Sequence, residues 1–176
     1  MLTRPEVIDL HPVAHPAPDI RQVGFPLDHP YLEQCWGPLI GPSSVSFLRH
    51  CVFHWQEEHP ARLCTADLAA ELGLGRGVGP NSVLWRTIGR LEYFRFARHD
   101  PYGAGLEVFT RVAPVTPDRL SRLPQWVRER HDRLNGERLE AVGRQIGCDP
   151  PVQDRMAARL DHMVRNPTPK NASLGR

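Results

Sequence analysis

Between residues 43 and 112 the spacing of apolar side chains changes from a helical period to a strand-like one, and this change limits the possible folds most. The stretch SSVSFLRHCVFHWQEE places Val45, Leu48, Val52 and Trp55 on one side of a helix. The next stretch, TADLAAELGL, predicts a shorter helix that ends at Gly73. Two helices therefore precede the central part of the chain.

A third helix is predicted by PNSVLWRTIGRL, residues 80–91, with Asn81 or Ser82 as its cap. Leu84, Ile88 and Leu91 fall at i, i+4 and i+7, which places them on one core-facing stripe. The opposite side carries a row of polar, basic and small residues, namely Ser82, Arg86, Gly89, Arg90 and Tyr93.

Two runs with a period of two follow this helix. YFRFARHD and LEVFTRVAP both alternate, and PYGAG between them is rich in turn residues, so the three stretches predict a β-hairpin. Residues 43–112 thus resemble a bacterial winged helix-turn-helix domain. The motif CTADLAAELGLG resembles the second helix of that family, NSVLWRTIGRLEYF its recognition helix and RFARHDPYGAGLEVF its wing. The fold class that we expect is mainly α with a small β-hairpin.

The resemblance implies sequence-specific binding of double-stranded DNA, usually by a transcriptional regulator and often by a homodimer, without a cofactor. It places the recognition helix at about residues 81–94 and the wing at about 95–112. Base-edge contacts would come from Ser82, Arg86 and Arg90, and wing contacts from Arg98, His99 and Tyr102. Arginine suits this work because its planar guanidinium can bond guanine O6 and N7 together or grip a phosphate.

The charge distribution is consistent with this expectation. The chain has a net charge of +2, but residues 1–75 carry −5, residues 76–138 carry +5 and residues 139–176 carry +2. The basic block includes the third helix and the hairpin, as a nucleic-acid-facing half would. Arginine supplies 21 of the 22 basic residues, a bias that we attribute to a GC-rich bacterial genome.

We expect three regions. Residues 1–40 read as a proline-rich N-terminal arm that ends in a docked aromatic segment, YLEQCWGPLIGP, residues 31–42. Residues 41–136 form the winged helix-turn-helix domain and a following helix, which Thr116 caps and Pro124 interrupts. Residues 137–176 form a helical extension with an amphipathic segment, VQDRMAARLDHMV, and a disordered tail. That segment either packs on its own domain or forms a dimer contact.

Other functions remain open. The fold could serve a protein-binding adaptor that does not bind DNA, or a phage- or plasmid-type replication or maintenance protein. The stretch GLGRGVGPNS lacks the lysine of a P-loop and follows a helix, so we interpret it as a connector. The histidines and cysteines between His50 and Cys64 match no standard zinc spacing. We expect no metal site and no enzymatic activity.

The cellular location follows from what the sequence lacks. No apolar run is long enough to span a bilayer, and MLTRPEVIDLHP lacks the apolar centre of a signal peptide. The four cysteines, at 35, 51, 64 and 148, are too scattered to indicate a disulfide framework. We expect a cytoplasmic protein without membrane partners.

Overall fold

The computed structural model describes residues 5–77, 79–100 and 105–146. The chain divides into two compact units, Met1–Asn135 and Gly136–Arg176. The strands are β1 (Val7–Val13), β2 (Phe25–Pro26), β3 (Ala61–Cys64), β4 (Ala97–His99), β5 (Leu106–Phe109) and β6 (Arg111–Val112). The helical elements are α1 (Pro18–Val23), the π-helical turn η1 (Leu32–Trp36), α2 (Gly37–Ile40), α3 (Pro42–His54), α4 (Thr65–Glu71), α5 (Val83–Tyr93), α6 (Pro117–Leu120) and α7 (Gln125–Ile146).

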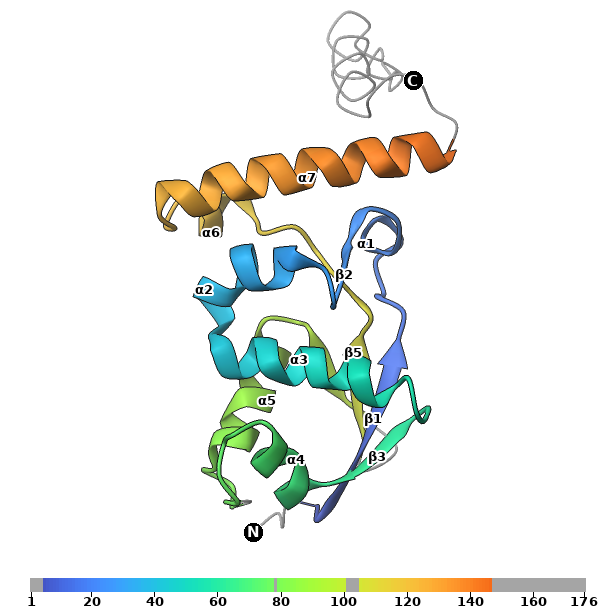
Figure 1. Ribbon diagram of the computed structural model, residues 1–176, viewed down its shortest axis with the longest axis vertical. Helices are drawn as coiled ribbons and strands as arrows, with labels where there is room; N and C mark the ends of the chain where they lie inside the picture. Colours follow the sequence, from blue (N-terminus) through green and yellow to red (C-terminus); the bar gives the residue numbers. More distant parts are fainter. Residues whose placement is uncertain (1–4, 78, 101–104, 147–176) are drawn as a thin grey trace, which may run out of the picture. The chain divides into compact units, whose positions relative to one another are not determined.

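Four strands form a mixed sheet in the order β3-β1-β5-β4. Figure 1 labels three of them, β3, β1 and β5. Strand β1 is antiparallel to β3 and parallel to β5, and Leu10 is paired with Ala61 on one side and with Leu106 on the other. Strand β4 is antiparallel to β5, with Ala97 opposite Val108. The short strands β2 and β6 pair separately, Phe25 opposite Val112.

The expected winged helix-turn-helix is therefore wrong, and the fold is a mixed α/β fold. The hairpin of β4 and β5 is present, but it is the edge of a four-stranded sheet and does not stand free as a wing. The cause is β1, which comes from the region expected to be an N-terminal arm and is an inner strand of the sheet. Because β1 is far from β5 in the sequence, no pattern next to the hairpin indicates that these two strands pair.

Strand β1 accommodates Pro12 because this residue lies beyond the part of the strand that pairs with β3. Ile8 and Leu10 are buried, whereas Asp9 and His11 are not, so the strand alternates as a strand covered on one face does. Strand β3 pairs only with residues 7–10, and Pro12 lies beyond that ladder. A residue without a backbone N–H is acceptable where one side of the strand is open.

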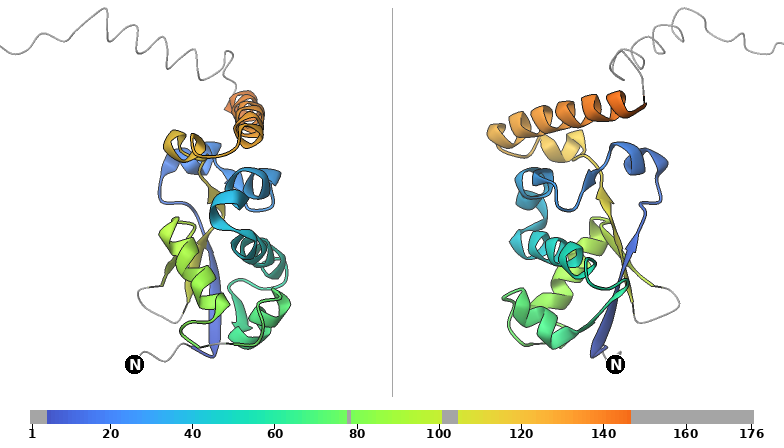
Figure 2. Two further views of the ribbon diagram at one scale, coloured as in Figure 1. Left: turned by 90° about the vertical axis from the view of Figure 1, so that its left-hand side faces the viewer. Right: turned by 45° about the vertical axis from the view of Figure 1, so that its right-hand side comes forward.

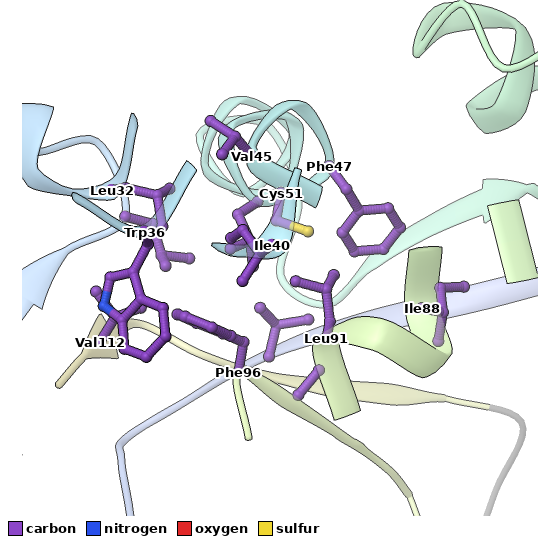
Figure 3. Packing of buried hydrophobic residues seen from close by; sticks show 14 of the residues in the cluster. Leu32, Trp36, Ile40, Val45, Phe47, Cys51, Ile88, Leu91, Phe96 and Val112 are labelled. Carbon is purple, nitrogen blue, oxygen red and sulfur yellow. The ribbon is translucent and has the colours of Figure 1, made fainter. Parts of the chain in front are cut away.

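Helices α3, α4 and α5 lie on one side of the four-stranded sheet (Figure 2). All three were predicted from the sequence. The predicted core-facing residues of α5 are confirmed, since Leu84, Ile88 and Leu91 are at most 1% exposed. Figure 3 shows Ile88 and Leu91 among buried side chains from α3 and the segment before it. The indole N–H of Trp55, just after α3, donates to the Leu10 carbonyl at 2.9 Å and ties this layer to β1.

The aromatic segment before α3 is packed against the rest of the domain by buried contacts. Tyr31 is fully buried, stacks on Phe25 with 3.8 Å between ring centroids, and accepts a hydrogen bond from the backbone N–H of Val115. The Trp36 indole N–H donates to the Ala113 carbonyl at 2.8 Å. These contacts join η1 to the chain that leaves the sheet after β6.

Two further helices follow. Thr116 is the N-cap residue of α6 and Pro117 its first residue, and α7 begins at Gln125, directly after Pro124. The predicted amphipathic segment at residues 152–164 and the tail lie outside the described residues. Within the described ranges, no helix combines the length and the apolar character needed to cross a membrane.

Candidate nucleic-acid interface

Helix α5 carries the predicted recognition face, and its amphipathic sequence fixes which side is exposed. Ser82 is the N-cap, and its hydroxyl accepts a hydrogen bond from the Trp85 backbone N–H at 3.5 Å. With the apolar stripe buried, the opposite side points to solvent. We call this side the α5 face, defined by the exposed residues Arg86, Gly89, Arg90 and Tyr93.

Arg86 is the most available cation of the α5 face. It is exposed, and its side chain has no hydrogen-bond or ion-pair partner in the part of the chain that the structure describes. An arginine held by no carboxylate keeps all five guanidinium donors for a ligand.

Arg90 has a structural contact as well as an exposed position. Its Nη1 donates to the carbonyl oxygen of Ile40 at 3.1 Å, where α2 ends. That carbonyl belongs to the last turn of a helix, which leaves its carbonyl groups without helical partners. Arg90 therefore joins α5 to the corner between α2 and α3, and its other guanidinium N–H groups remain for a ligand.

The predicted wing residues are held by acidic neighbours. The Arg98 guanidinium pairs with the carboxylate of Glu107 on the adjoining strand β5. The His99 ring contacts the Glu92 carboxylate of α5, which also accepts from the His99 backbone N–H at 3.1 Å. Tyr102 lies outside the described residues. The structure thus brings Ser82, Arg86 and Arg90 together on α5, whereas Arg98 and His99, on the hairpin, each contact a carboxylate.

Two basic residues that sequence reasoning left out of the site lie beside the end of α5. Tyr93, Phe94 and Arg95 line a hollow together with Arg119 and Arg122, which come from the region of α6. The Arg119 guanidinium lies 4.7 Å from the ring centroid of Phe94, a cation–π contact. Their membership in the basic block was visible in the sequence, but their proximity to α5 depends on the path of the chain through β5 and β6.

Arg95 has an unusual backbone conformation, with φ of 60°. Its N–H donates to the Glu92 carbonyl and the Phe96 N–H donates to the Leu91 carbonyl, so it closes α5 in a Schellman motif. Glycine is the usual residue at this position because other side chains are strained there. This strained residue contributes a basic side chain to the lining of the hollow.

A second, largely apolar hollow lies along α3. Its volume is about 500 Å³, and its lining includes Val45, Arg49 and His50. Arg49 is held there, since its guanidinium pairs with Glu33 at 3.0 Å. Phe53, further along α3 and 57% exposed, lines an adjoining hollow. This surface lacks the unpaired arginines of the α5 face.

The histidines and cysteines between His50 and Cys64 have separate surroundings in the structure. Cys51 is buried on the core side of α3, and His54 contacts the Glu71 carboxylate at 3.0 Å. Among the described residues, no three His, Cys, Asp or Glu side chains are grouped closely enough to hold a metal ion.

No protein-family model, no curated protein and no solved structure matches this chain. The case for a function therefore rests on the arrangement of its own residues.

Proposed function

We propose that the protein binds double-stranded DNA through the α5 face. The observation that carries this proposal is the pair Arg86 and Arg90, one helical turn apart on an exposed surface with Gly89 between them. Residues at i and i+4 are separated by about 6 Å along a helix axis, so both guanidinium groups can enter one groove. Neither arginine forms an ion pair among the residues described.

Gly89 adds an independent argument. It lies in the middle of an 11-residue helix, where glycine costs about 1 kcal/mol relative to alanine. A Cβ placed there would meet nothing within 4 Å, so packing inside the chain does not require a glycine. The absence of a side chain lets an outside backbone approach the helix closely, which is how phosphate backbones meet glycine-bearing surfaces.

Electrostatics favour a polyanion over an uncharged partner. The block of residues 76–138 carries a net charge of +5 and includes the α5 face together with Arg95, Arg119 and Arg122. Phosphate neutralisation by arginine releases condensed counterions, which drives association at low salt. The hairpin contributes less, since Arg98 and His99 already contact carboxylates.

The finer role that we propose is sequence-specific regulation of transcription. Base reading requires a side chain that reaches into the groove without being held by the protein itself, and Arg86 meets this requirement best. Selection of bound sequences from a random duplex pool would test it. Enrichment of one motif that Arg86→Ala relaxes would support this role, and recovery of unselected sequences would contradict it.

Fluorescence anisotropy with a labelled mixed-sequence duplex at low ionic strength tests the binding itself. We expect saturable binding with micromolar protein, because even non-specific complexes typically have dissociation constants of about 10⁻⁴–10⁻⁶ M at physiological salt and bind more tightly at lower salt. Absence of binding would contradict the proposal. A protein partner would then be the better candidate, because Phe53 presents an exposed ring beside the apolar hollow along α3.

A further inference from the structure

A second, more enclosed hollow shares lining residues with the hollow at the C-terminal end of α5, and we call the two together the aromatic cleft. The outer hollow has a volume of about 440 Å³ and the inner one about 250 Å³. Both are lined by Phe94, Arg95, Thr116 and Arg119. Pockets for small molecules typically measure roughly 300–1,000 Å³, so the aromatic cleft is large enough for such a ligand.

Aromatic rings form the walls of the aromatic cleft. Trp36 lies edge-on to Phe94, with 6.1 Å between ring centroids, and the Arg119 guanidinium lies 5.7 Å from the Trp36 ring. Tyr93 is 75% exposed at the outer end, where its ring meets Phe94 edge-on. An aromatic ring exposed to this extent offers a free face on which a planar group can stack.

The charge of the aromatic cleft is positive and unpaired. Arg95, Arg119 and Arg122 line it against a single carboxylate, Asp118, and none of the three arginines forms an ion pair among the described residues. The pKa of His15, which lines the inner hollow, is lowered by burial, so its ring is neutral at pH 7 and adds no charge. The Thr116 hydroxyl makes no hydrogen bond within the described ranges.

The strained backbone conformation of Arg95 is a reason to expect a ligand at this site. An arginine with φ of 60° is less favourable than the glycine that this position would accept. Strained residues that persist in a fold are concentrated at binding and catalytic sites, so an observed outlier is a reason to look for a ligand. Here the strained residue is also a cation that lines both hollows.

We propose that the aromatic cleft binds a nucleoside phosphate. Its base would stack on the exposed face of Tyr93, with Phe94 edge-on beside it. Its phosphate would be held by Arg95 and Arg122, because a planar guanidinium matches the geometry of a phosphate. The ligand is either a free nucleotide or an unpaired nucleotide of a strand. This site goes beyond duplex binding, since it requires an unstacked base, which a closed duplex does not offer.

Titration calorimetry with the four nucleoside 5′-monophosphates, and with inorganic phosphate as reference, tests the proposal. We expect at least one monophosphate to bind roughly five- to 100-fold more tightly than phosphate, as base stacking predicts. Arg95→Gly and Arg122→Ala should each weaken binding, while Tyr93→Ala should remove the advantage over phosphate. Arg62→Ala, an exposed arginine on β3, is the matched control and should bind as the unchanged protein does.

Folding does not confound these variants. Arg95→Gly relieves the positive φ and should raise the melting temperature, while Arg122 is exposed and its side chain has no partner within the described ranges. If Arg95→Gly is more stable and yet binds the ligand more weakly, the change acts on the site and not on folding. Absence of binding by any monophosphate at millimolar concentration, together with no preference for a duplex with unpaired nucleotides, would overturn the proposal. Monophosphate binding that neither variant weakens would overturn it as well.

Two duplexes distinguish a free nucleotide from an unpaired nucleotide of a strand. They also test the aromatic cleft separately from duplex binding by the α5 face, the proposed function. A duplex with unpaired 3′ nucleotides that binds more tightly than its blunt form, with the difference lost in Tyr93→Ala, identifies a strand-borne nucleotide. Equal affinity for both duplexes, together with monophosphate binding, identifies a free nucleotide. Binding of the blunt duplex without any binding of monophosphates or preference for unpaired ends contradicts the aromatic cleft alone and leaves the α5 face supported.

Discussion

The sheet surface that carries Arg62 and Arg98 and the α5 face are both charged, but they differ in the groups that contact their arginines. On the sheet, Arg98 pairs with Glu107 on the neighbouring strand, and Arg62 lies 3.8 Å from Asp9. On α5, Arg86 has no partner among the residues described, and Arg90 contacts only a backbone carbonyl. The arginines of the sheet surface are paired with carboxylates of the same chain, whereas those of the α5 face keep guanidinium donors for a ligand. Density of arginine alone is therefore a poor guide to a binding surface.

The largest effect tests whether α5 presents one fixed face. Ile88 is 1% exposed on the buried side of α5, so Ile88→Ala should lower the free energy of unfolding by about 2–5 kcal/mol through lost transfer energy and a cavity. Val83→Ala on the same helix, 39% exposed, is the control and should cost far less. Urea denaturation measures both. Equal small losses would mean that the helix does not hold the orientation described.

The next effect compares the two surfaces directly. Arg86→Ala should weaken duplex binding by about 1–3 kcal/mol, because an unpaired guanidinium that contacts bases or phosphate is lost. Arg98→Ala removes an arginine of the same charge from the sheet surface, where Glu107 already engages it. We expect its affinity, measured by anisotropy, to change no more than about two-fold. If the two variants weakened binding equally, pairing would not distinguish the surfaces.

A smaller effect concerns Gly89. Gly89→Ala should raise the free energy of unfolding by about 0.5–1 kcal/mol, because a helix interior disfavours glycine and the space around this one is open. The same change should weaken duplex binding, since a methyl group then separates the helix from the ligand backbone. Gly136→Ala in α7, where the space is open too, should stabilise without any effect on binding. Stabilisation by both variants with unaltered binding would remove Gly89 from the interface.

The smallest effect releases a paired arginine. Glu107→Gln removes the carboxylate that holds Arg98, and an exposed ion pair of this kind contributes less than about 1 kcal/mol to stability. Duplex affinity should rise slightly, by no more than about three-fold, because one negative charge is lost near the hairpin. A large gain would show that Arg98 is a contact residue which Glu107 suppresses, and would extend the interface onto β4.

Local periodicity accounts for the parts of the fold that sequence reasoning predicted. The stripe of Leu84, Ile88 and Leu91 is buried as its spacing required, and Ser82 caps the helix. The β4–β5 hairpin follows from two alternating runs around a turn. In each case the deciding contacts lie close together in sequence.

Strand β1 shows what local periodicity could not supply. Ile8 and Leu10 alternate with Asp9 and His11, so a strand pattern is present, but prolines surround it and favour an arm. Its parallel partner, β5, lies far along the chain, with Leu10 opposite Leu106. No turn fixes the register of such a pair, and this strand is what converts the expected winged helix into a mixed sheet.

The candidate site divides in the same way. Exposure of Arg86 followed from helical spacing, whereas the contact of Arg90 with the Ile40 carbonyl depends on how α5 packs beside α2. Pairing of Arg98 with Glu107 depends on strand register, since these residues are opposite each other in the β4–β5 ladder. Arg119 reaches the Phe94 ring only because the chain returns past α5. Side chains brought together by tertiary packing leave no signature in the spacing of residues.

The salt dependence of duplex binding tests the central claim most directly. Because each phosphate contact releases counterions, the log–log slope of affinity against salt should become shallower by about 0.9 for each contact removed. For the unchanged protein we predict an affinity that falls steeply as salt rises, measured by anisotropy on one duplex. Arg86→Ala should lower the affinity at every salt concentration, whereas Arg98→Ala should change it by no more than about two-fold and leave the slope as it is. No binding at low salt, or an affinity that Arg86→Ala leaves unaltered, would contradict the claim that the α5 face binds DNA.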